Sequence, residues 1–500
     1  MHEELTAQSR RPALLQWFWW IAGALVFAGA WNRIDSPDSF AVPALLIAAC
    51  ALVPSYLWCA GQAPGLPIFP LYTAVFLLTH VFPLLSPPPL LIASNTEESV
   101  WKAALTVAGF LLLATASWWF SLNRPRARPT TCLILGGERG HSLYLVILMA
   151  SVALSVATNA DWLSQFSEGM FATLRGFVRG LTGLAVLMLA TSWGERTLSP
   201  ASTKAFLVLF VGFCIADAAS LFLVSAVVAC TMLAVGFVLG RGRLPVLVLV
   251  AVVVLGLLHM GKGPMRQRYW TPGAQGHVIE PWRYPSLYAD WLEASLDQLA
   301  ATKSGENQSA TIFGRVNNLT LLLQVQRMSP LDVPLLHGET YAIIPSSLLP
   351  RLFFPDKTSP HLSTSMLNVH FGNQTWEAAE STTIGWGLLN ESLANFGLAG
   401  CAGLAVVLGL FYGLVTRLGI GFPTASIHAL VGIFTMGFAV QTEWTASVFI
   451  STYLQGLMAV LAVALVSAKR MSIRDATGET DLVLPGCSAA GVPAPAAHIN

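Results

Sequence analysis

Long apolar segments constrain this chain more than any other feature of its sequence. A bilayer crossing takes about 20 predominantly apolar residues in a helix, and twelve segments meet this requirement. We predict them at 14–31, 39–60, 65–85, 100–122, 141–158, 170–192, 204–218, 222–240, 244–260, 386–415, 422–441 and 445–467. Hydrophobic residues make up 54% of the chain and charged residues 11%, a balance typical of membrane proteins. The expected fold class is therefore an all-α polytopic membrane protein.

The stretch 204–240 leaves two arrangements open, because it could form two short spans or one long bent span. Asp217 and the three small residues after it favour a turn and therefore two spans. Basic residues concentrate in short cytoplasmic connections, and with twelve spans and the N-terminus inside only Arg33 and Lys102 fall in short outside connections. The fourteen inside are Arg10, Arg11, Arg124, Arg126, Arg128, Arg139, Arg196, Lys204, Arg241, Arg243, Arg417, Lys469, Arg470 and Arg474. We expect both termini to be cytoplasmic and the first helix to be uncleaved.

One long polar interval separates nine of these spans from the last three. It divides the chain into an N-terminal membrane bundle at 1–260, an external loop at 261–385, C-terminal membrane helices at 386–467 and a disordered cytoplasmic tail at 468–500. Connections of such length are usually functional or disordered. The aromatic and apolar content of the loop argues against disorder.

Two helices are expected inside this loop. The stretch Ser286–Ala300 places leucines and a tryptophan near one face, so it either lies on the bilayer surface or covers a core of the loop. A second helix is expected at 312–328. Six prolines between Pro330 and Pro360 then predict an irregular stretch.

Motifs for nucleotide and metal chemistry are absent from the sequence. There is no P-loop, no HExxH and no Cys/His cluster with zinc spacing. None of the seven cysteines lies in the loop, and the net charge of +1 provides no field to attract nucleic acid. We therefore expect no cofactor, no metal and no nucleic-acid partner. A reaction outside the membrane must then use energy already stored in its substrate.

Arginines and lysines of the loop are the first candidates for a binding site. They either form a solvated surface or bind phosphate groups, for which the arginine fork is well suited. Arg315 and Arg351 lie among apolar residues, so each should have an anionic partner. Arg175 and Arg179 share one face of the span at 170–192 and either snorkel to the surface or hold a lipid phosphate.

Glu391 is the strongest acidic candidate, because a carboxylate inside a membrane segment is costly and indicates either function or a buried pair. Asn395 lies one helical turn further on and should share its face. A carboxylate here could act as a base for an accepting hydroxyl, or it could form a structural salt bridge to a loop arginine. The histidines of the loop, His337, His361 and His370, are weaker candidates for a base.

Three stretches of the chain resemble the O-antigen polymerase (Wzy-type) family of oligosaccharide repeat-unit polymerases. They are KGPMRQRYW (Lys262–Trp270), HGETYAIIPSSLLPRLFFPDKTS (His337–Ser359) and STTIGWGLLNESLANFGLAG (Ser381–Gly400). Arg327 and Gly338 also match an R-x10-G spacing found in loops of such polymerases. Leu393 departs from the pattern, since the family usually has an aromatic residue there.

The resemblance implies a reaction outside a bacterial inner membrane. A glycan on undecaprenyl diphosphate is transferred to a sugar hydroxyl of another lipid-linked repeat unit, and the lipid diphosphate leaves. The implied partners are the lipid-linked oligosaccharide, membrane lipid and a chain-length regulator, and the product is a surface polysaccharide or exopolysaccharide.

The expected roles in this glycosyltransferase follow from that reaction. Arg315 and Arg351 would bind the departing diphosphate, and Glu391 would orient or deprotonate the acceptor. Substrate-binding roles are expected for Arg175, Arg179, Arg327, Glu339, Tyr341, Lys357 and Asn395. The alternatives are an O-antigen ligase, which uses another acceptor, a transporter or flippase for the lipid-linked sugar, and a non-catalytic assembly protein.

Overall fold

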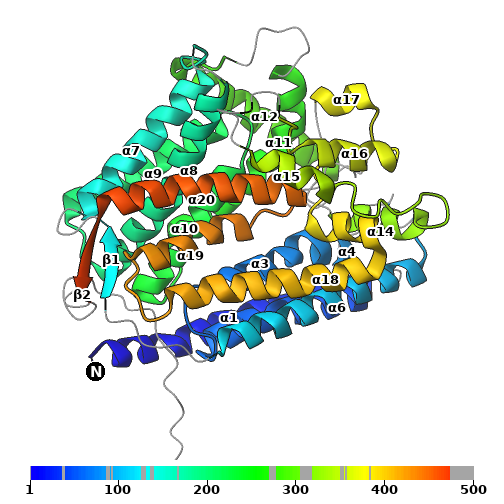
Figure 1. Cartoon of the computed structure of the whole chain (residues 1–500), viewed down its shortest axis with the longest axis horizontal. Coiled ribbons are helices and arrows are strands. Elements are labelled where there is room, and N and C mark those ends of the chain that lie inside the picture. The colour runs from blue at the N-terminus through cyan, green and yellow to red at the C-terminus, as the bar shows by residue number, and fades with distance from the viewer. Residues whose placement is uncertain are drawn as a thin grey trace, which may run out of the picture.

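The structure is a computed structural model that describes residues 2–35, 40–85, 91, 94–124, 131–135, 140–165, 168–269, 278–303, 318–349, 354, 357–381 and 384–472. Most of these residues lie in helices, which form a bundle with connections at its two ends (Figure 1).

Eleven helical elements of the described chain precede the long loop or extend into it. They are α1 (His2–Asp35), α2 (Ala41–Cys59), α3 (Ile68–Phe76), the π-helix η1 (Leu77–Val81), α4 (Phe82–Leu85), α6 (Glu97–Leu122), α7 (Gly140–Asn159), α8 (Glu168–Glu195), α9 (Pro200–Ala218), α10 (Val224–Arg241) and α11 (Val246–Tyr269).

Shorter helices of the loop and the last three long helices follow. They are η3 (Pro281–Arg283), α12 (Tyr284–Lys303), α14 (Asn318–Met328), η5 (Tyr341–Ile343), α15 (Ile344–Leu348), α16 (Leu362–His370), α17 (Trp376–Ser381), α18 (Leu388–Gly419), α19 (Ile427–Ala439) and α20 (Ala446–Ser467).

Nine helices within the described part of the chain are long and apolar enough to cross a membrane, which confirms the all-α polytopic membrane fold. They are Ala13–Trp31, Ala41–Cys59, Ile68–Leu85, Glu97–Leu122, His141–Asn159, Pro200–Ala218, Val224–Arg241, Val246–Tyr269 and Leu388–Gly419. The expected segments 170–192, 422–441 and 445–467 are also helical, as α8, α19 and α20. A count of twelve crossings stays a prediction. The turn expected within 204–240 is present, since α9 ends at Ala218 and α10 begins at Val224.

A small antiparallel sheet lies at one end of the bundle, which we call the strand end. β1 (Thr131–Leu135) precedes α7, and β2 (Ala468–Ser472) follows α20. Because the two strands pair, the chain returns after α20 to the end from which α7 begins. This arrangement requires an even number of crossings between the strands. The expected disordered tail at 468–500 is corrected here, because its first five residues form β2.

Small residues set the closest helix contacts. Gly409 and Gly413 of α18 lie against α6, where a Cβ at Gly413 would meet Ser121 at 2.7 Å. Gly236 and Gly240 of α10 lie in the same way against backbone atoms of α8. Lipid tails are as apolar as the helix surfaces, so the hydrophobic effect contributes little to helix association in a membrane. Van der Waals contact between closely approaching backbones has to stabilise the helix pairs instead. Both glycine pairs have the four-residue spacing that puts them on one helix face.

The loop begins later than expected. α11 continues through Pro264 to Tyr269, so the KGPMRQRYW stretch, as far as it is described, is the end of a membrane helix and not loop. α12 packs against this extension and buries Leu287 and Trp291, whose Nε1 donates to the Leu258 carbonyl at 2.7 Å. The expected helix at 312–328 is confirmed from 318, and its first six residues lie outside the described part.

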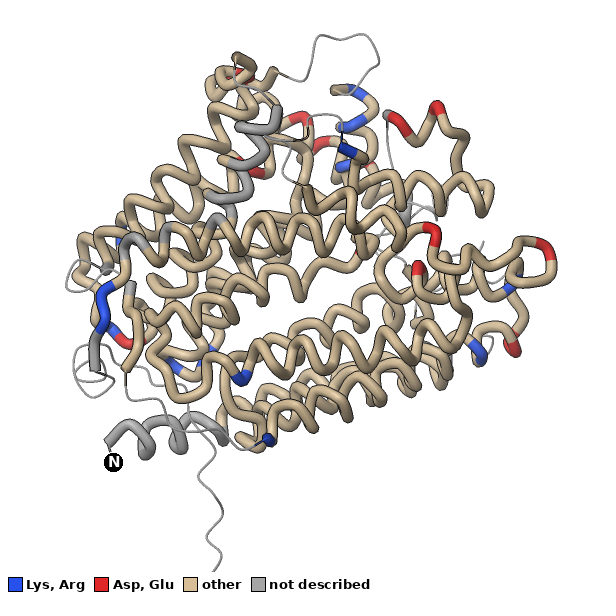
Figure 2. The backbone as a smooth tube through the Cα atoms, in the orientation of Figure 1, with Lys and Arg blue, Asp and Glu red and all other residues tan. Residues whose placement is uncertain are grey.

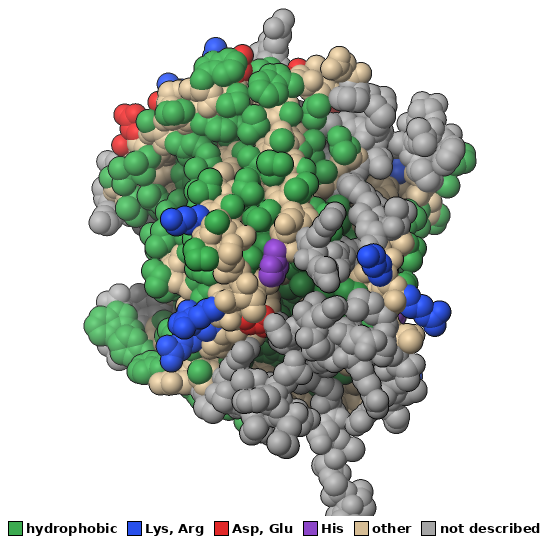
Figure 3. Space-filling model, turned by 90° about the vertical axis from the view of Figure 1, so that its left-hand side faces the viewer, with side chains coloured by type: hydrophobic (Ala, Val, Ile, Leu, Met, Phe, Trp, Pro, Cys, Tyr) green, Lys and Arg blue, Asp and Glu red, His purple; other side chains and the backbone are tan. Residues whose placement is uncertain are grey.

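Charged residues are distributed as a membrane bundle requires. Lys, Arg, Asp and Glu lie around connections and helix ends, while the middle sections of the helices are nearly free of them (Figure 2). The face shown in Figure 3 carries hydrophobic side chains over most of its upper half and several Lys and Arg side chains across its middle.

Candidate functional site

The candidate site lies at the other end of the bundle, which we call the loop end, formed by residues 318–349, 357–381 and 384–387 and the helix ends that they contact. Its foundation is an interruption of α18. Gly397 has φ +61° and ψ −149°, a conformation open almost only to glycine, so the chain changes direction there (Figure 1). The break separates a short helix at 388–396 from the long span that follows. It also frees the last carbonyl groups of the short helix for other partners.

A tight turn of the loop supplies hydrogen-bond donors to those carbonyl groups. The backbone N–H groups of Leu336 and His337 donate to the carbonyls of Ala394 (3.1 Å) and Asn395 (3.0 Å). The next N–H, of Gly338, donates to the Asn395 side-chain oxygen at 3.0 Å. Gly338 has φ +98°, and a Cβ there would meet the Phe396 ring at 3.0 Å. Glycine is therefore required both by the backbone and by the space.

Glu391 lies at the centre of this contact and is fully buried. One carboxylate oxygen accepts from the Thr340 hydroxyl at 2.8 Å, and the other accepts from the backbone N–H of Ala446. Asn395 donates to the Thr340 hydroxyl at 2.9 Å and to the Glu391 carbonyl at 2.8 Å. The three side chains thus form one directional network from Asn395 through Thr340 to Glu391. The expectation that Glu391 and Asn395 share a helix face is confirmed.

The network also fixes the start of α20. Ala446 is the first residue of that helix, and no side-chain cap is made by Thr445. A carboxylate at a helix N-terminus accepts an otherwise unpaired N–H and complements the positive end of the helix dipole. Beside it, the buried hydroxyls of Ser363 and Thr445 lie 2.7 Å apart, and Ser363 also bonds Ser447. Glu391 therefore joins α18, the loop and α20.

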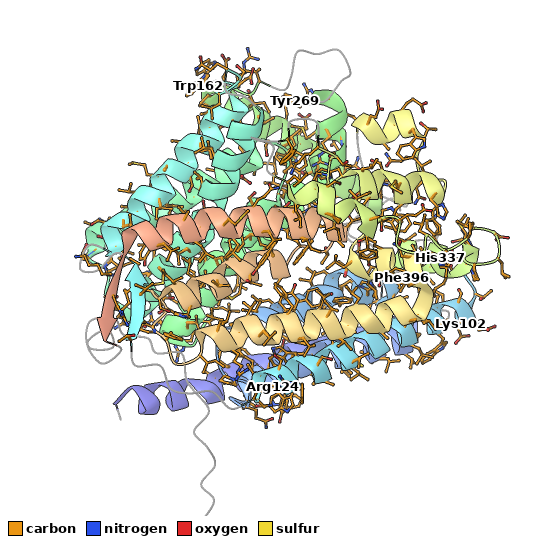
Figure 4. The ribbon with its side chains drawn as sticks, in the orientation of Figure 1. Lys102, Arg124, Trp162, Tyr269, His337 and Phe396 are labelled. Atoms are coloured by element: carbon orange, nitrogen blue, oxygen red, sulfur yellow. The ribbon has the colours of Figure 1, made fainter. Side chains whose placement is uncertain are left out.

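An aromatic pair covers the network. Tyr341 stacks on Phe396 with ring centroids 5.8 Å apart and an interplanar angle of 19°. Burial and the nearby Glu391 raise the pKa of the Tyr341 hydroxyl well above its usual value, so it stays neutral. Phe396 is 45% exposed, and it lies beside His337 at the loop end in Figure 4. An aromatic face exposed beside polar groups suits a sugar ring.

Trp386 anchors the segment before α18. Its ring is fully buried, and Nε1 donates to the Asn368 side-chain oxygen at 2.7 Å. The glycines on either side have no room for a Cβ, since one at Gly385 would meet Glu443 and one at Gly387 the Thr442 carbonyl. The GWG motif therefore packs the start of α18 closely against the α19–α20 connection.

The structure brings together four of the expected site residues, Glu339, Tyr341, Glu391 and Asn395. Glu339 is exposed beside the buried network. Lys357 lies further along the loop, where Nζ donates to the Ser347 carbonyl at 2.7 Å.

Of the other expected cations, the described Arg327 is not part of this group. Arg327 is exposed at the end of α14, where its guanidinium donates to the Ser94 carbonyl at 3.4 Å. Arg315 and Arg351 lie outside the described residues, as do the side chains of Arg175 and Arg179 on α8. Their expected contacts with a diphosphate stay predictions. Among the described residues no cluster of His, Cys, Asp or Glu could hold a metal ion.

Sequence reasoning missed the partners of Glu391. Within the described part of the chain Glu391 makes no ion pair, and its carboxylate is held by neutral donors. Thr340 carried no signal of its own, because a single loop threonine is common. The helix end at Ala446 could be located only to within several residues.

Comparisons with models of protein families, with curated proteins and with solved structures find no match to this chain.

Proposed function

We propose that this protein is a membrane glycosyltransferase that polymerises oligosaccharide repeat units linked to a polyprenyl diphosphate. The observation that carries the proposal is the contact between two of the stretches on which the family resemblance rests. The GETY segment, through His337, Gly338 and Thr340, bonds the ESLANF segment, through Glu391 and Asn395. These segments lie more than fifty positions apart in the sequence. Their contact explains in physical terms why both motifs have the residues they have.

The geometry supports a division of labour within that reaction. Glu391 uses both carboxylate oxygens to hold the loop and α20, so we assign it the orienting part of its expected role: it positions Glu339 and Tyr341 beside the exposed Phe396 ring. Arg315 and Arg351 are proposed to bind the leaving diphosphate, where negative charge develops. The acceptor oxygen bonds the anomeric carbon as the bond from the sugar to the phosphate breaks. The electron pair of that bond leaves on the diphosphate, the hydroxyl proton passes to water, and no nucleotide is needed.

Reconstitution tests this proposal directly. The purified chain in lipid nanodiscs, given a polyprenyl-diphosphate-linked repeat unit, should produce longer glycans and release polyprenyl diphosphate. Arg315→Ala and Arg351→Ala should each abolish elongation without loss of folded protein. The control Arg283→Ala removes an arginine that is exposed and paired with Glu280, and it should elongate normally. Absence of new glycosidic bonds with the wild-type chain would refute the enzyme.

A transporter of lipid-linked sugar is the second candidate, because two interrupted helices occur in the described bundle. The π-helix η1 interrupts the span 68–85, and Gly397 interrupts α18. Transporters place substrates between discontinuous helices. In the same assay a transporter would move the lipid-linked sugar across the bilayer and leave its length unchanged. A ligase would instead transfer the glycan once, to a different acceptor.

A further inference from the structure

A small, mainly apolar pocket with a few polar groups lies beside the network just described, within the membrane bundle. It is bounded by α3 and η1 on one side and by the start of α18 and the α19–α20 connection on the other. Its lining includes Tyr72, Phe76, His80, Trp386, Asn390 and Thr442. None of the described lining residues is Asp, Glu, Lys or Arg. The pocket is partly open and narrow, with room for a hydroxyl or hydroxymethyl group.

Two side chains of this pocket have unmet hydrogen-bonding capacity. His80 is 2% exposed and Asn390 1% exposed. Among the described residues, His80 Nε2 and Asn390 Oδ1 have no hydrogen-bond partner. A buried polar atom without a partner costs free energy comparable to a lost hydrogen bond, and such atoms are rare in native structures. Two of them on one pocket indicate that something binds there.

Asn390 leaves an atom that can only accept, and His80 leaves one whose role follows its tautomer. The Thr79 hydroxyl lies 2.8 Å from His80 Nδ1 and 3.2 Å from the Val75 carbonyl, and its single proton can bond either of them. His80 Nε2 is an acceptor when Nδ1 carries the imidazole proton and a donor in the other tautomer. Asn390 uses its Nδ2 on the carbonyls of Asn318 and Trp386, which leaves Oδ1 as an acceptor. The pocket therefore suits a neutral group that donates to Asn390 Oδ1 and pairs with His80 Nε2.

The local backbone is consistent with a binding role. His80 belongs to η1, and π-helical turns inside α-helices occur frequently at functional sites. The imidazole is held flat against Phe76, with ring centroids 4.8 Å apart and an angle of 17°. The orientation of the His80 ring is thus fixed by its neighbours on the same helix.

We infer that this pocket, lined by His80 and Asn390, binds a hydroxyl-bearing arm of a sugar ring. A hydroxyl both donates and accepts, so it can pair with Asn390 Oδ1 and with His80 Nε2 in either tautomer, and its small size fits the pocket. The inference rests on the proposed function for the identity of the sugar, as part of the lipid-linked repeat unit. Its chemistry, a neutral hydroxyl between Asn390 Oδ1 and His80 Nε2, is independent of that function.

Binding of free sugars tests the pocket. The probes are the methyl glycosides of glucose, galactose and mannose, added to the chain in nanodiscs free of sugar detergents and followed by saturation-transfer NMR. His80→Phe keeps the ring stack and removes Nε2, and it should weaken binding about 3- to 10-fold, the value of one hydrogen bond. His80→Gln keeps an acceptor and should lose less. The control His141→Phe makes the same change on α7, where His141 bonds Ser192, and should bind as the wild type does.

Four results would contradict the inference. No glycoside binding by the wild type, equal binding by His80→Phe, or binding of inorganic phosphate that His80→Phe abolishes would each overturn the inference. A stabilisation by sodium that depends on His80 would do the same. If polymerisation fails in the reconstituted assay while His80-dependent glycoside binding persists, the pocket stands and the proposed function does not. If polymerisation is normal and no such binding occurs, the proposed function stands and the pocket does not.

Discussion

The two ends of the bundle are held together by different means. At the strand end, β1 and β2 pair through backbone groups, and the side chains of Lys469 and Arg470 are exposed. At the loop end, buried side chains add connections to the backbone bonds, and Thr340, Glu391 and Asn395 are all fully buried. One end therefore tolerates many side chains, whereas the other demands particular ones.

This difference has an energetic consequence. A backbone group that loses its partner in an exposed strand bonds water instead, and the net change is small. A buried donor that loses its acceptor has no such replacement and costs its full desolvation. The loop end should thus be the sensitive end, both for stability and for the shape of the candidate site.

The largest effect is expected for Glu391→Ala. It leaves the Thr340 hydroxyl and the Ala446 N–H without an acceptor, at about 1–3 kcal/mol each, so the loss should be about 2–6 kcal/mol. Thermal unfolding in nanodiscs measures it. The control Glu443→Ala removes an exposed carboxylate at the same end and should leave the midpoint within a degree or so of the wild type. Equal midpoints for the two variants would remove Glu391 from the structural role given to it.

A smaller loss is expected for Gly397→Ala. The left-handed backbone at Gly397 strains any residue with a Cβ, by about 1–3 kcal/mol. Gly403→Ala is the matched control in the same helix: nothing lies within 4 Å of a Cβ there, and alanine should stabilise the helix by up to about 1 kcal/mol. Replacing glycine by alanine should therefore lower the stability at position 397 and raise it at position 403 of the same helix. A stabilised Gly397→Ala would mean that α18 is continuous.

Thr340→Val tests the middle of the network. Valine has the shape of threonine but lacks the hydroxyl, so Glu391 and Asn395 each lose one hydrogen bond. The free energy of unfolding should fall by about 1–3 kcal/mol. Thr340→Ser keeps the hydroxyl and should retain most of the stability. On the proposed function, glycan elongation should fall in the Val variant and recover in the Ser variant. Identical behaviour of the two variants would show that the hydroxyl is irrelevant.

The sequence predicted the helices of this fold well, and the reason is physical. Apolar runs long enough to cross a bilayer have few other ways to satisfy their backbone groups. Each expected segment is helical, and even the turn between α9 and α10 followed from Asp217. The end of α11 was placed nine residues too early, because charged residues such as Arg266 and Arg268 do not end a helix that leaves the membrane.

The candidate site was predicted only in part. The cost of a buried carboxylate pointed to Glu391, and helical spacing joined it to Asn395. Thr340 and the N–H of Ala446 could not be found, because their role depends on two segments meeting in space. The pocket at His80 was missed for the same reason: its second unpaired atom, Asn390 Oδ1, comes from a helix far along the chain.

The smallest effect is expected at the strand end, from Arg470→Pro. Proline removes a backbone donor from β2, opposite Leu133. β1 should keep its place, since Cys132 and Ile134 are buried against Phe422 and Ala425 independently of β2. A two-stranded sheet contributes little by itself, so the loss relative to Arg470→Ala should be under about 1 kcal/mol. Hydrogen exchange should rise at 131–135 alone. A loss as large as that of Thr340→Val would mean that the backbone connection matters as much as the buried network, and the contrast between the two ends would fail.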